Sequence, residues 1–592
     1  MNFRKINIFE KLINEIHGYL NEKQFLIFSS IMVGVSAGLA AVILKSFVHF
    51  IRKNFVEGYL YIQDFKLAYI FLPLIGIGLT ILIIKRFYNN ILSKGISFIL
   101  QAIAKKSSFL PFHHMWAHII TSGITVGFGG SVGLESPIVN TGSAIGSNYA
   151  RRYKLNYRER TLLLAAGAAG GIAGAFNAPI AGVLFALEVL LIDINLTAFI
   201  PLLIASASGA LMSKIILNES ILLNFKLKQP FDYHNLPFYI LLALLAGIVS
   251  LYYVNVFSFI ESKFKKTKSK LTRWFFGGTL LAILLILFPS LFGEGYESIK
   301  QLSELNIESF INNSVLKNLV SNKWGILLFL TITFLLKSVA ASLTIGAGGN
   351  GGNFAPSLFV GAHLGFAFAL LLQLLGFNSI PIINFTLVAM AGLLSGVFHA
   401  PLTAIFLIAE ITGGYELIIP LMVVSSISFA FVKYFHPDSF DVKKLKLKGT
   451  VVSEDKDTSI LGKIDISKLV ETDFTILKPE DNLGVIVENI KLSNRNIFPV
   501  VAAGGKLVGI ITMSSIKKEM FNQELYTKVF AQEIMHKPEI KIKHNEDIFS
   551  VMDKFEESGS WNLPVTELGV YRGFLSKSSI LTEYREQLLS SI

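Results

Sequence analysis

The 592-residue sequence contains no cysteine and is poor in charge. Without cysteine, disulfides and cysteine-ligated metal sites are excluded. Charged residues make up 16% of the chain, whereas an ordinary soluble protein carries roughly a quarter. This deficit is too large for a buried soluble core to explain, so a wholly soluble fold is excluded.

Long apolar stretches are present instead, and hydrophobic residues make up 52% of the chain. A helix needs ~18–20 apolar residues to cross the ~30 Å of hydrocarbon in a bilayer. Such stretches recur from Phe25 to Phe435, for example Phe25–Leu44, Leu67–Ile84, Phe238–Val256 and the run that begins at Trp324. The sequence therefore predicts a multi-pass membrane domain over residues 24–447.

The segment before the first apolar stretch carries charges of both signs and has no small-residue cleavage site. We therefore expect residues 1–23 to form a cytoplasmic amphipathic helix and not a signal peptide.

The net charge of +12 comes largely from basic clusters in short connections beside apolar stretches. These clusters lie at residues 151–160, 263–273 and 443–448. The positive-inside rule places them in the cytoplasm. We expect a protein of the inner membrane with both termini cytoplasmic. Nucleic acid is the competing explanation for the basic charge, but short juxtamembrane loops argue against it.

Composition changes after Leu447, and residues 451–592 are charged and lack a spanning stretch. Within them, Pro499 and Gly509 recur as Pro564 and Gly573 at nearly the same spacing, each in a strand-like run. Two units with this matching layout predict a tandem α/β module, at about residues 465–522 and 530–588.

The membrane domain also contains a repeat. The motif Ala169-Gly170, Gly174, Phe176, Asn177-Ala178-Pro179-Ile180 and Glu188 recurs at one constant offset as Ala391-Gly392, Gly396, Phe398, His399-Ala400-Pro401-Leu402 and Glu410. Upstream, Gly133–Pro137 aligns with Gly352–Pro356 at nearly the same offset. The halves cover about residues 24–217 and 237–435, and transporters often place their site between such halves. The count of spans leaves open whether the repeats are parallel or inverted.

The glycine-rich turns Gly127–Pro137 and Gly346–Pro356 each precede an apolar helix-like run. A helix N-terminus offers free backbone N–H groups and a positive dipole end, which can replace the hydration of an anion. Broken helices are tolerated at membrane depth where they line a cavity. Both turns are therefore candidate anion cradles, although glycines could instead serve close helix packing.

Glu135 is an acidic residue in the first turn, whereas its repeat partner is Phe354. An ionisable group inside a membrane is a functional candidate by default. It could compete with an anion when ionised and withdraw when protonated, acting as gate and proton carrier. A structural ion pair is the alternative, but no Lys or Arg lies between Lys106 and Arg151.

With the duplicated Phe-x-Ala-Pro segments and the C-terminal tandem module, these motifs resemble the CLC family of chloride channels and proton-coupled chloride transporters with a CBS domain pair. The resemblance implies an all-α polytopic membrane domain of two inverted repeats with broken helices, followed by a cytosolic α/β CBS pair. It also implies a homodimer with one pore per protomer that transports chloride and protons. No metal, cofactor or catalytic residue is expected. Glu135 would gate the pore, and the implied anion-binding residues are Lys94, Gly95, Ile96, Gly133, Leu134, Ser136, Asn353, Phe354, Ala355 and Phe440.

Two positions depart from the family pattern at the anion site. Lys94 replaces a residue whose hydroxyl contacts the central anion. Its side chain could attract anions, or it could snorkel towards cytoplasmic water, which we favour. The family's coordinating Tyr is absent, and Phe440 or Asp441 takes its place depending on the alignment. Asp441 would repel anions, whereas Phe440 would make the inner end apolar.

Val189 stands where many coupled transporters carry an internal proton-transfer Glu, and its repeat partner is Ile411. Glu188 and Glu410 are expected to anchor helix ends. In the CBS pair, Ser515 and Ser579 replace a common ribose-binding Asp. These serines argue against adenine-nucleotide binding, and they fit an interaction or dimer-stabilising role equally well.

Anion transport is the function that the sequence favours, with a proton-coupled chloride antiporter ahead of a passive gated channel because of Glu135. The alternative from another class is a membrane-anchored sensor or enzyme that works through residues 451–592. That segment has no nucleophile–base arrangement or phosphate loop.

Overall fold

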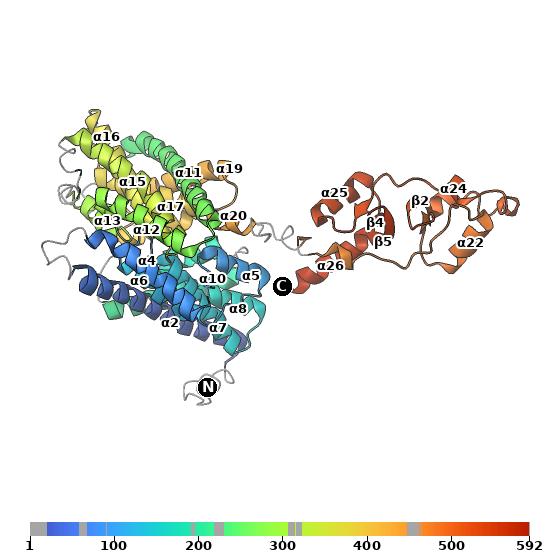
Figure 1. Ribbon diagram of the computed structural model, residues 1–592, viewed down its shortest axis with the longest axis horizontal. Helices are drawn as coiled ribbons and strands as arrows, with labels where there is room; N and C mark the ends of the chain where they lie inside the picture. The colour runs from blue at the N-terminus through green and yellow to red at the C-terminus, as the bar shows by residue number, and fades with distance from the viewer. Residues whose placement is uncertain are drawn as a thin grey trace. The chain divides into compact units, whose positions relative to one another are not determined.

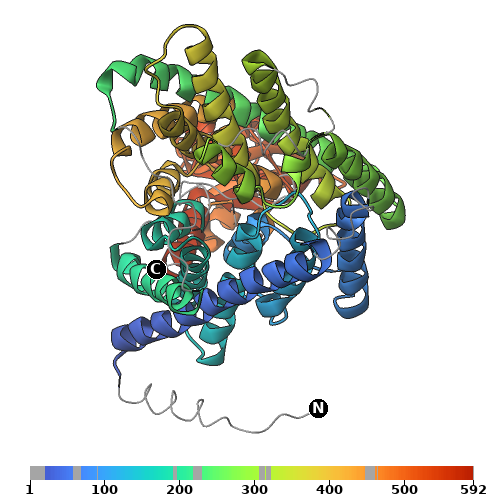
Figure 2. The ribbon, with the colours of Figure 1, turned by 90° about the vertical axis from the view of Figure 1, so that its left-hand side faces the viewer.

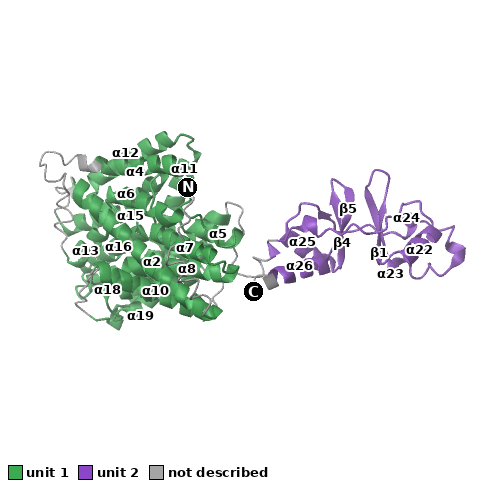
Figure 3. Cartoon of the chain, turned by 90° about the horizontal axis from the view of Figure 1, so that it is seen from below, with its two compact units in different colours: residues 1–452 green, residues 453–592 purple. Residues whose placement is uncertain are grey.

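The computed structural model describes residues 20–57, 68–89, 91–190, 196–217, 230–305, 314, 316, 322–446, 461–462 and 464–590. The chain divides into two compact units, residues 1–452 and 453–592 (Figure 3). We call them the membrane unit and the C-terminal unit. The expected helix at residues 1–23 falls largely outside the described residues, which include only its last few positions.

The first half of the membrane unit is helical (Figure 1). Its helices are α2 (Glu22–Ile51), α4 (Ala68–Phe87), α5 (Ile96–Lys105), α6 (His114–Gly127), α7 (Glu135–Arg152), α8 (Tyr157–Phe176), α9 (Pro179–Phe185) and α10 (Leu196–Leu217). Two π-helical segments, η1 (Arg52–Glu57) and η2 (Ala186–Leu190), continue α2 and α9. Figure 2 shows α2 as the long blue helix along one face.

The second half is helical too. Its α-helices are α11 (Leu236–Lys266), α12 (Lys270–Leu287), α13 (Tyr296–Ser303), α15 (Lys323–Gly346), α16 (Phe354–Leu374), α17 (Ile382–Phe398), α18 (Pro401–Thr412), α19 (Ile418–Phe435) and α20 (Phe440–Lys446). Short 3-10 turns η3 (Tyr233–Asn235) and η4 (Pro289–Leu291) precede α11 and follow α12. Among the described residues, seven helical stretches are long and apolar enough to cross a membrane, and several others are shorter.

Helices of the first half approach one another closely at glycines. A Cβ placed on Gly167 of α8 would lie 2.6 Å from the carbonyl carbon of Gly142 in α7. On Gly38 of α2 it would lie 2.7 Å from the Cα of Gly209 in α10. Small residues let backbones pack directly where lipid supplies no hydrophobic drive between helices. These glycines therefore bring α2, α7, α8 and α10 together.

The repeat positions mark matching helix ends in the two halves. α8 ends at Phe176 and α17 at Phe398, and the next residue of each, Asn177 or His399, takes left-handed angles with φ 54° and 57°. α9 and α18 then begin at Pro179 and Pro401. Proline favours the first helical position because the missing N–H has no partner there in any helix. The repeated sequence thus breaks both halves at the same place.

The C-terminal unit is α/β. Its helices are α22 (Leu483–Leu492), α23 (Met513–Ile516), α24 (Ala531–Ile534), α25 (Ile548–Ser558) and α26 (Lys577–Ser590), with 3-10 turns η6 (Ile466–Lys468) and η7 (Gln523–Leu525). Its strands are β1 (Ile497–Val501), β2 (Leu507–Thr512), β3 (Ile542–Lys543), β4 (Asn562–Glu567) and β5 (Val570–Ser576). β1 pairs with β2, and β3, β4 and β5 form the second sheet in that order.

Each sheet contains an antiparallel hairpin with the same register. Val500 of β1 faces Gly509 of β2, and Val565 of β4 faces Gly573 of β5. The prolines noted in the sequence, Pro499 and Pro564, directly precede these valines. The matched prolines and glycines of the sequence therefore belong to two copies of one hairpin.

Candidate anion pathway

The two glycine-rich turns meet in the membrane unit. The backbone N–H of Gly133 donates to the carbonyl of Gly352, and the N–H of Gly352 donates to the carbonyl of Gly133, both at 2.8 Å. A Cβ on Gly133 would lie 2.9 Å from the Cβ of Ala355, and one on Gly352 would lie 2.7 Å from the Cβ of Ser136. Only glycine allows the turns to come this close.

Helices begin at both turns, as the sequence predicts. α7 starts at Glu135 and α16 at Phe354, so Pro137 and Pro356 each occupy the third helical position. The first amides of each helix have no partner within their own helix. The turns therefore direct two positive helix ends to one region of the membrane unit.

A cavity of about 440 Å³ lies beside these helix ends. Eight of the expected site residues line it: Lys94, Gly95, Ile96, Glu135, Ser136, Asn353, Phe354 and Phe440. The other three, Gly133, Leu134 and Ala355, belong to the turns and helix starts but not to the cavity wall. The structure therefore brings together residues from both halves and from the end of the membrane unit.

Glu135 is buried, with 3% of its surface exposed. Its Oε2 accepts a hydrogen bond from the N–H of Ala355 at 3.4 Å, and its Oε1 accepts one from the hydroxyl of Tyr296 at 2.6 Å. Ala355 is the second residue of α16, so the carboxylate of the first half lies on the amide end of the second half. Sequence reasoning missed Tyr296, which lies far from Glu135 in the chain.

Lys94 faces the second turn. Its Nζ donates to the carbonyls of Gly348 and Gly349 at 2.9 and 2.8 Å. The snorkelling orientation that we favoured is therefore wrong. The turn presents two backbone carbonyls that hold the ammonium group, because Gly348 takes a positive φ of 117°. The lysine charge is thereby kept at the cavity wall.

Phe440 and Asp441 both line the cavity. The Phe440 ring packs edge-on against Phe257 with centroids 5.2 Å apart. Lys444 Nζ lies 4.1 Å from the centre of the Phe440 ring. The carboxylate of Asp441 accepts a hydrogen bond from the N–H of Ser97 at 3.2 Å. This end of the cavity combines an apolar ring with charges of both signs.

Comparison with models of protein families shows to which family the chain belongs. A model described as voltage gated chloride channel matches residues 76–433, and a CBS domain model matches residues 465–522 and 531–586. The first match covers more than half of the chain. The chain belongs to the CLC family.

Curated CLC relatives are moderately similar. The H(+)/Cl(-) exchange transporter ClcA of Vibrio cholerae is 26% identical over 421 residues, which cover 67% of this chain and 84% of ClcA. The voltage-gated ClC-type chloride channel ClcB of Salmonella typhimurium is 29% identical over 325 residues, 54% of this chain and 73% of ClcB.

Solved CLC structures share the fold. A slow cyanobacterial Cl-/H+ antiporter superposes with a TM-score of 0.63 at 22% identity, over 72% of this chain and 98% of that one. A eukaryotic CLC transporter gives a TM-score of 0.57 at 18% identity, over 94% and 97% of the two chains. The chain thus has a mostly helical CLC membrane domain followed by a small α/β CBS region.

Glu188 and Glu410 anchor helix ends in this CLC domain. The Glu188 carboxylate accepts hydrogen bonds from the N–H groups of Leu402 and Thr403 at 2.9 and 2.7 Å, in the first turn of α18. Glu410 accepts from Ile180 and Ala181 of α9 at 3.0 and 2.8 Å. Each half therefore supplies the carboxylate that caps a short helix of the other half.

The positions beside these glutamates are apolar. Val189 is partly buried and packs against the main hydrophobic core, and Ile411 is buried. Neither side chain can carry a proton.

Sequence reasoning also missed Lys337, in the middle of α15. It is fully buried, and its Nζ donates to Ser131 Oγ at 2.9 Å and to the carbonyls of Gly293 and Leu291 at 2.8 and 3.2 Å. These acceptors lie in the segments that precede α7 and α13, which carry Glu135 and Tyr296. A lysine within an apolar stretch was the signal that could have identified this support.

In the CBS region, Ser515 and Ser579 hydrogen-bond to their own turns. Ser515 Oγ donates to the carbonyl of Thr512 at 2.8 Å, and Ser579 Oγ donates to that of Ser576 at 2.9 Å. Each hydroxyl is therefore engaged locally and does not reproduce a ribose-binding carboxylate. In the parts of the chain that the structure describes, no group of three or more His, Cys, Asp or Glu side chains could hold a metal.

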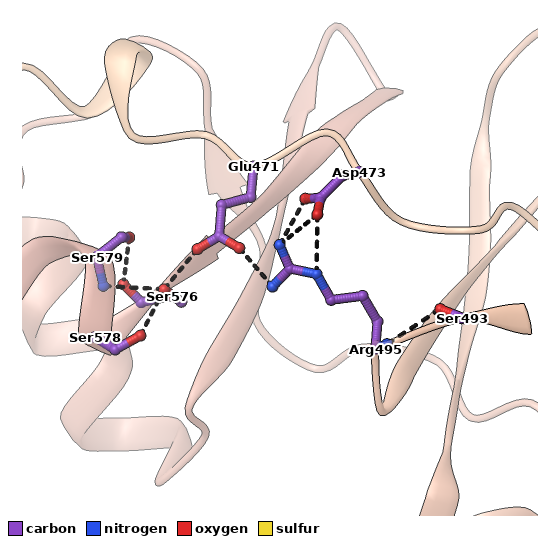
Figure 4. Close-up of polar contacts among 7 residues, drawn as sticks. All are labelled: Glu471, Asp473, Ser493, Arg495, Ser576, Ser578 and Ser579. Carbon is purple, nitrogen blue, oxygen red and sulfur yellow. Dashed lines mark hydrogen bonds and ion pairs between the residues drawn. The ribbon is translucent and has the colours of Figure 1, made fainter. Parts of the chain in front are cut away.

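An ion-pair network lies in the same unit (Figure 4). Arg495 contacts Glu471 at 2.7 Å and Asp473 at 2.6 Å, and Glu471 also accepts a hydrogen bond from Ser576 Oγ at 2.8 Å. The hydrogen bonds from Arg495 hold the pKa of Asp473 below its usual value. Since Arg495 precedes β1 and Ser576 ends β5, the network ties the two hairpins to the segment before Phe474.

Proposed function

We propose that the protein transports chloride across a membrane through the cavity of each protomer, with Glu135 as its gate. This proposal rests on one observation: the Glu135 carboxylate accepts a hydrogen bond from the first-turn amide of Ala355, beside a cavity lined by both halves. A carboxylate at such an amide occupies the place that a free anion would take. An anion moves through only after Glu135 leaves.

We further propose that transport is coupled to protons in the opposite direction. Glu135 can leave its amide partner when it takes up a proton, which links its position to proton movement. The relative from Vibrio cholerae bears the name of an H(+)/Cl(-) exchange transporter, which supports the same mode. The competing mode is a passive gated channel. Val189 favours that mode, because it supplies no internal proton acceptor.

The same proposal covers the assembly of the protein, its membrane and its orientation. The assembly is a homodimer in the inner membrane, with both termini and the CBS pair in the cytoplasm. The basic connections, such as Lys263–Arg273, support this orientation. A sensor that binds adenine nucleotides is the remaining alternative, and calorimetry of the full-length protein with ATP, ADP and AMP tests it directly.

Reconstitution into liposomes tests the transport proposal. Chloride efflux is followed with a chloride electrode while a pH electrode records proton uptake. We expect chloride efflux accompanied by proton movement in the opposite direction. Chloride efflux without proton movement would select the channel, and parallel runs with nitrate and fluoride define the anion preference.

The variant Glu135→Ala is the decisive test of the gate. It removes the carboxylate from the Ala355 amide, so chloride flux persists while proton movement is lost. Glu297→Ala is the matched control, because Glu297 lies on α13 beside Tyr296 but is exposed. If Glu135→Ala still moves protons as the wild type does, Glu135 is not the coupling group.

A further inference from the structure

A second carboxylate, Asp441 of α20, also lies on the amide end of a helix. Its Oδ1 accepts a hydrogen bond at 3.2 Å from the N–H of Ser97, the second residue of α5. The residue before this helix is Gly95, which has no side chain to cap it. Asp441 is buried, with 9% of its surface exposed, and comes from the opposite end of the membrane unit's sequence.

The arrangement repeats that of Glu135. Glu135 accepts from Ala355, the second residue of α16, and Asp441 accepts from the second residue of α5. Both carboxylates line the same cavity. Glu188 and Glu410 also cap helices, but they do not line it. The cavity is thus bordered by two tethered carboxylates, each on a helix end that attracts anions.

The charges around Asp441 favour an anion at this place. Lys94 on the α5 side and Lys444 on the next turn of α20 both line the cavity, as do Lys265 and Arg273. Glu261 of α11 pairs with Lys444 at 2.8 Å and with Lys265 at 3.0 Å. The surroundings therefore hold more positive than negative charge. A chloride ion would find the same partners as the Asp441 carboxylate does.

We propose that Asp441 is a second gating carboxylate, which occupies the amide end of α5 until a chloride ion displaces it. This inference rests on the proposed transport function. An anion that passes through the cavity then has to displace the Glu135 carboxylate at α16 and the Asp441 carboxylate at α5. The competing explanation is that Asp441 only caps α5 and that chloride never takes its place.

The variant Asp441→Asn separates the two explanations. Asparagine keeps an oxygen for the Ser97 amide, but it carries no charge to compete with chloride. Calorimetric titration of the purified protein with chloride measures binding, and liposome efflux measures transport. We expect chloride to bind about tenfold more tightly to Asp441→Asn than to the wild type, because a charge at a helix end contributes about this much. We expect faster efflux as well.

Two further variants complete the design. Asp438→Asn changes a nearby aspartate, which pairs with Lys446 and does not line the cavity, so binding and efflux stay at wild-type values. Asp441→Ser is a second neutral variant, with a shorter polar side chain, in case the asparagine variant folds poorly. We expect the double variant Glu135→Gln with Asp441→Asn to show faster efflux than either single change.

The outcomes are distinct. Equal chloride affinity and equal efflux in wild type, Asp441→Asn and Asp441→Ser would overturn the inference and leave Asp441 as a helix cap. Weaker binding in both variants would overturn it too, since Asp441 would then be part of the anion's support. If folded wild type and Asp438→Asn bind no chloride and show no efflux, the proposed function itself fails.

Discussion

Carboxylates that lie on helix amide ends fall into two groups in the described part of the chain. Glu188 and Glu410 accept two amide hydrogen bonds each and lie away from the cavity. Glu135 and Asp441 accept one amide hydrogen bond each and line it. An anion in this cavity can reach the carboxylates of Glu135 and Asp441, whereas those of Glu188 and Glu410 do not border it. Position at the cavity wall therefore separates the anchors from the candidate gates.

Tyr296→Phe tests how firmly Glu135 is held in place. The Tyr296 hydroxyl donates to the Glu135 carboxylate at 2.6 Å. A hydrogen bond to a charged group contributes about 1.5–3 kcal/mol, so its loss frees Glu135 from its place. We expect chloride efflux from liposomes to rise about tenfold, with proton coupling retained because the carboxylate remains.

Tyr252→Phe is the control for this change. Tyr252 belongs to α11, and its hydroxyl donates to the carbonyl of Leu335 in α15 at 3.2 Å and not to Glu135. The control removes the same atom from a partly buried tyrosine and leaves efflux unchanged. A Tyr296→Phe protein with wild-type efflux would show that Tyr296 does not restrain the gate.

At the residue scale, the sequence predicted the position of Glu135 but not its partners. The glycine-rich turn and the lack of nearby basic residues identified the carboxylate. Tyr296 and Lys337 come from distant segments, and a side-chain contact between distant segments leaves no periodic signal in one sequence. The predicted orientation of Lys94 was wrong because two backbone carbonyls hold its ammonium group. The direction of a backbone carbonyl cannot be read from the sequence.

At the scale of elements, each of the short helices α9 and α18 is capped by a glutamate from the other half of the chain. Glu410→Ala removes the acceptor for two first-turn amides of α9, and Glu188→Ala does the same for α18. Loss of a capping acceptor costs about 0.5–2 kcal/mol of the free energy of unfolding. We expect each variant to unfold at a lower temperature in detergent, with chloride affinity unchanged in the folded protein.

Glu416→Ala serves as the control, since Glu416 is exposed on the connection between α18 and α19. Its unfolding midpoint stays at the wild-type value. A Glu188 or Glu410 variant with normal thermal stability but altered chloride affinity would place that glutamate in the pathway instead.

The element boundaries are the part of the fold that the repeat predicted best. One constant offset along the chain relates the ends of α8 and α17, their left-handed caps and the prolines that begin α9 and α18. A nearly equal offset relates the starts of α7 and α16. Glycine and proline impose backbone geometry directly, so their spacing carries over to structure. The inverted relation of the halves, in contrast, stays a prediction.

At the scale of the whole molecule, the C-terminal unit has its own means of holding its two hairpins together. Arg495→Ala removes the ion pairs with Glu471 and Asp473 and the contact with the Phe474 ring. We expect faster hydrogen exchange in peptides that cover residues 471–501 of the full-length protein at pH 7. Arg572→Ala breaks an exposed ion pair within one hairpin and produces a smaller change.

The difference in hydrogen exchange between the wild type and Arg495→Ala becomes smaller as the pH falls. Because the folded-state pKa of Asp473 is depressed by Arg495, its contribution to stability is present above the unfolded value of about 4. That contribution is lost as the pH falls through the depressed folded value. The wild type and Arg495→Ala therefore converge in acid when compared at matched pH. A constant difference down to strongly acidic pH would assign the effect to packing on Phe474.

The two reciprocal backbone hydrogen bonds between Gly133 and Gly352 have a mechanical consequence. Two buried hydrogen bonds of 2.8 Å join one half of the chain to the other, and sliding the halves by about 1 Å would strain both bonds at once. We therefore expect the centre of the protein to act as a fixed pivot. In the proposed transport cycle, we expect side chains such as that of Glu135 to move while the backbone of these two turns stays in place.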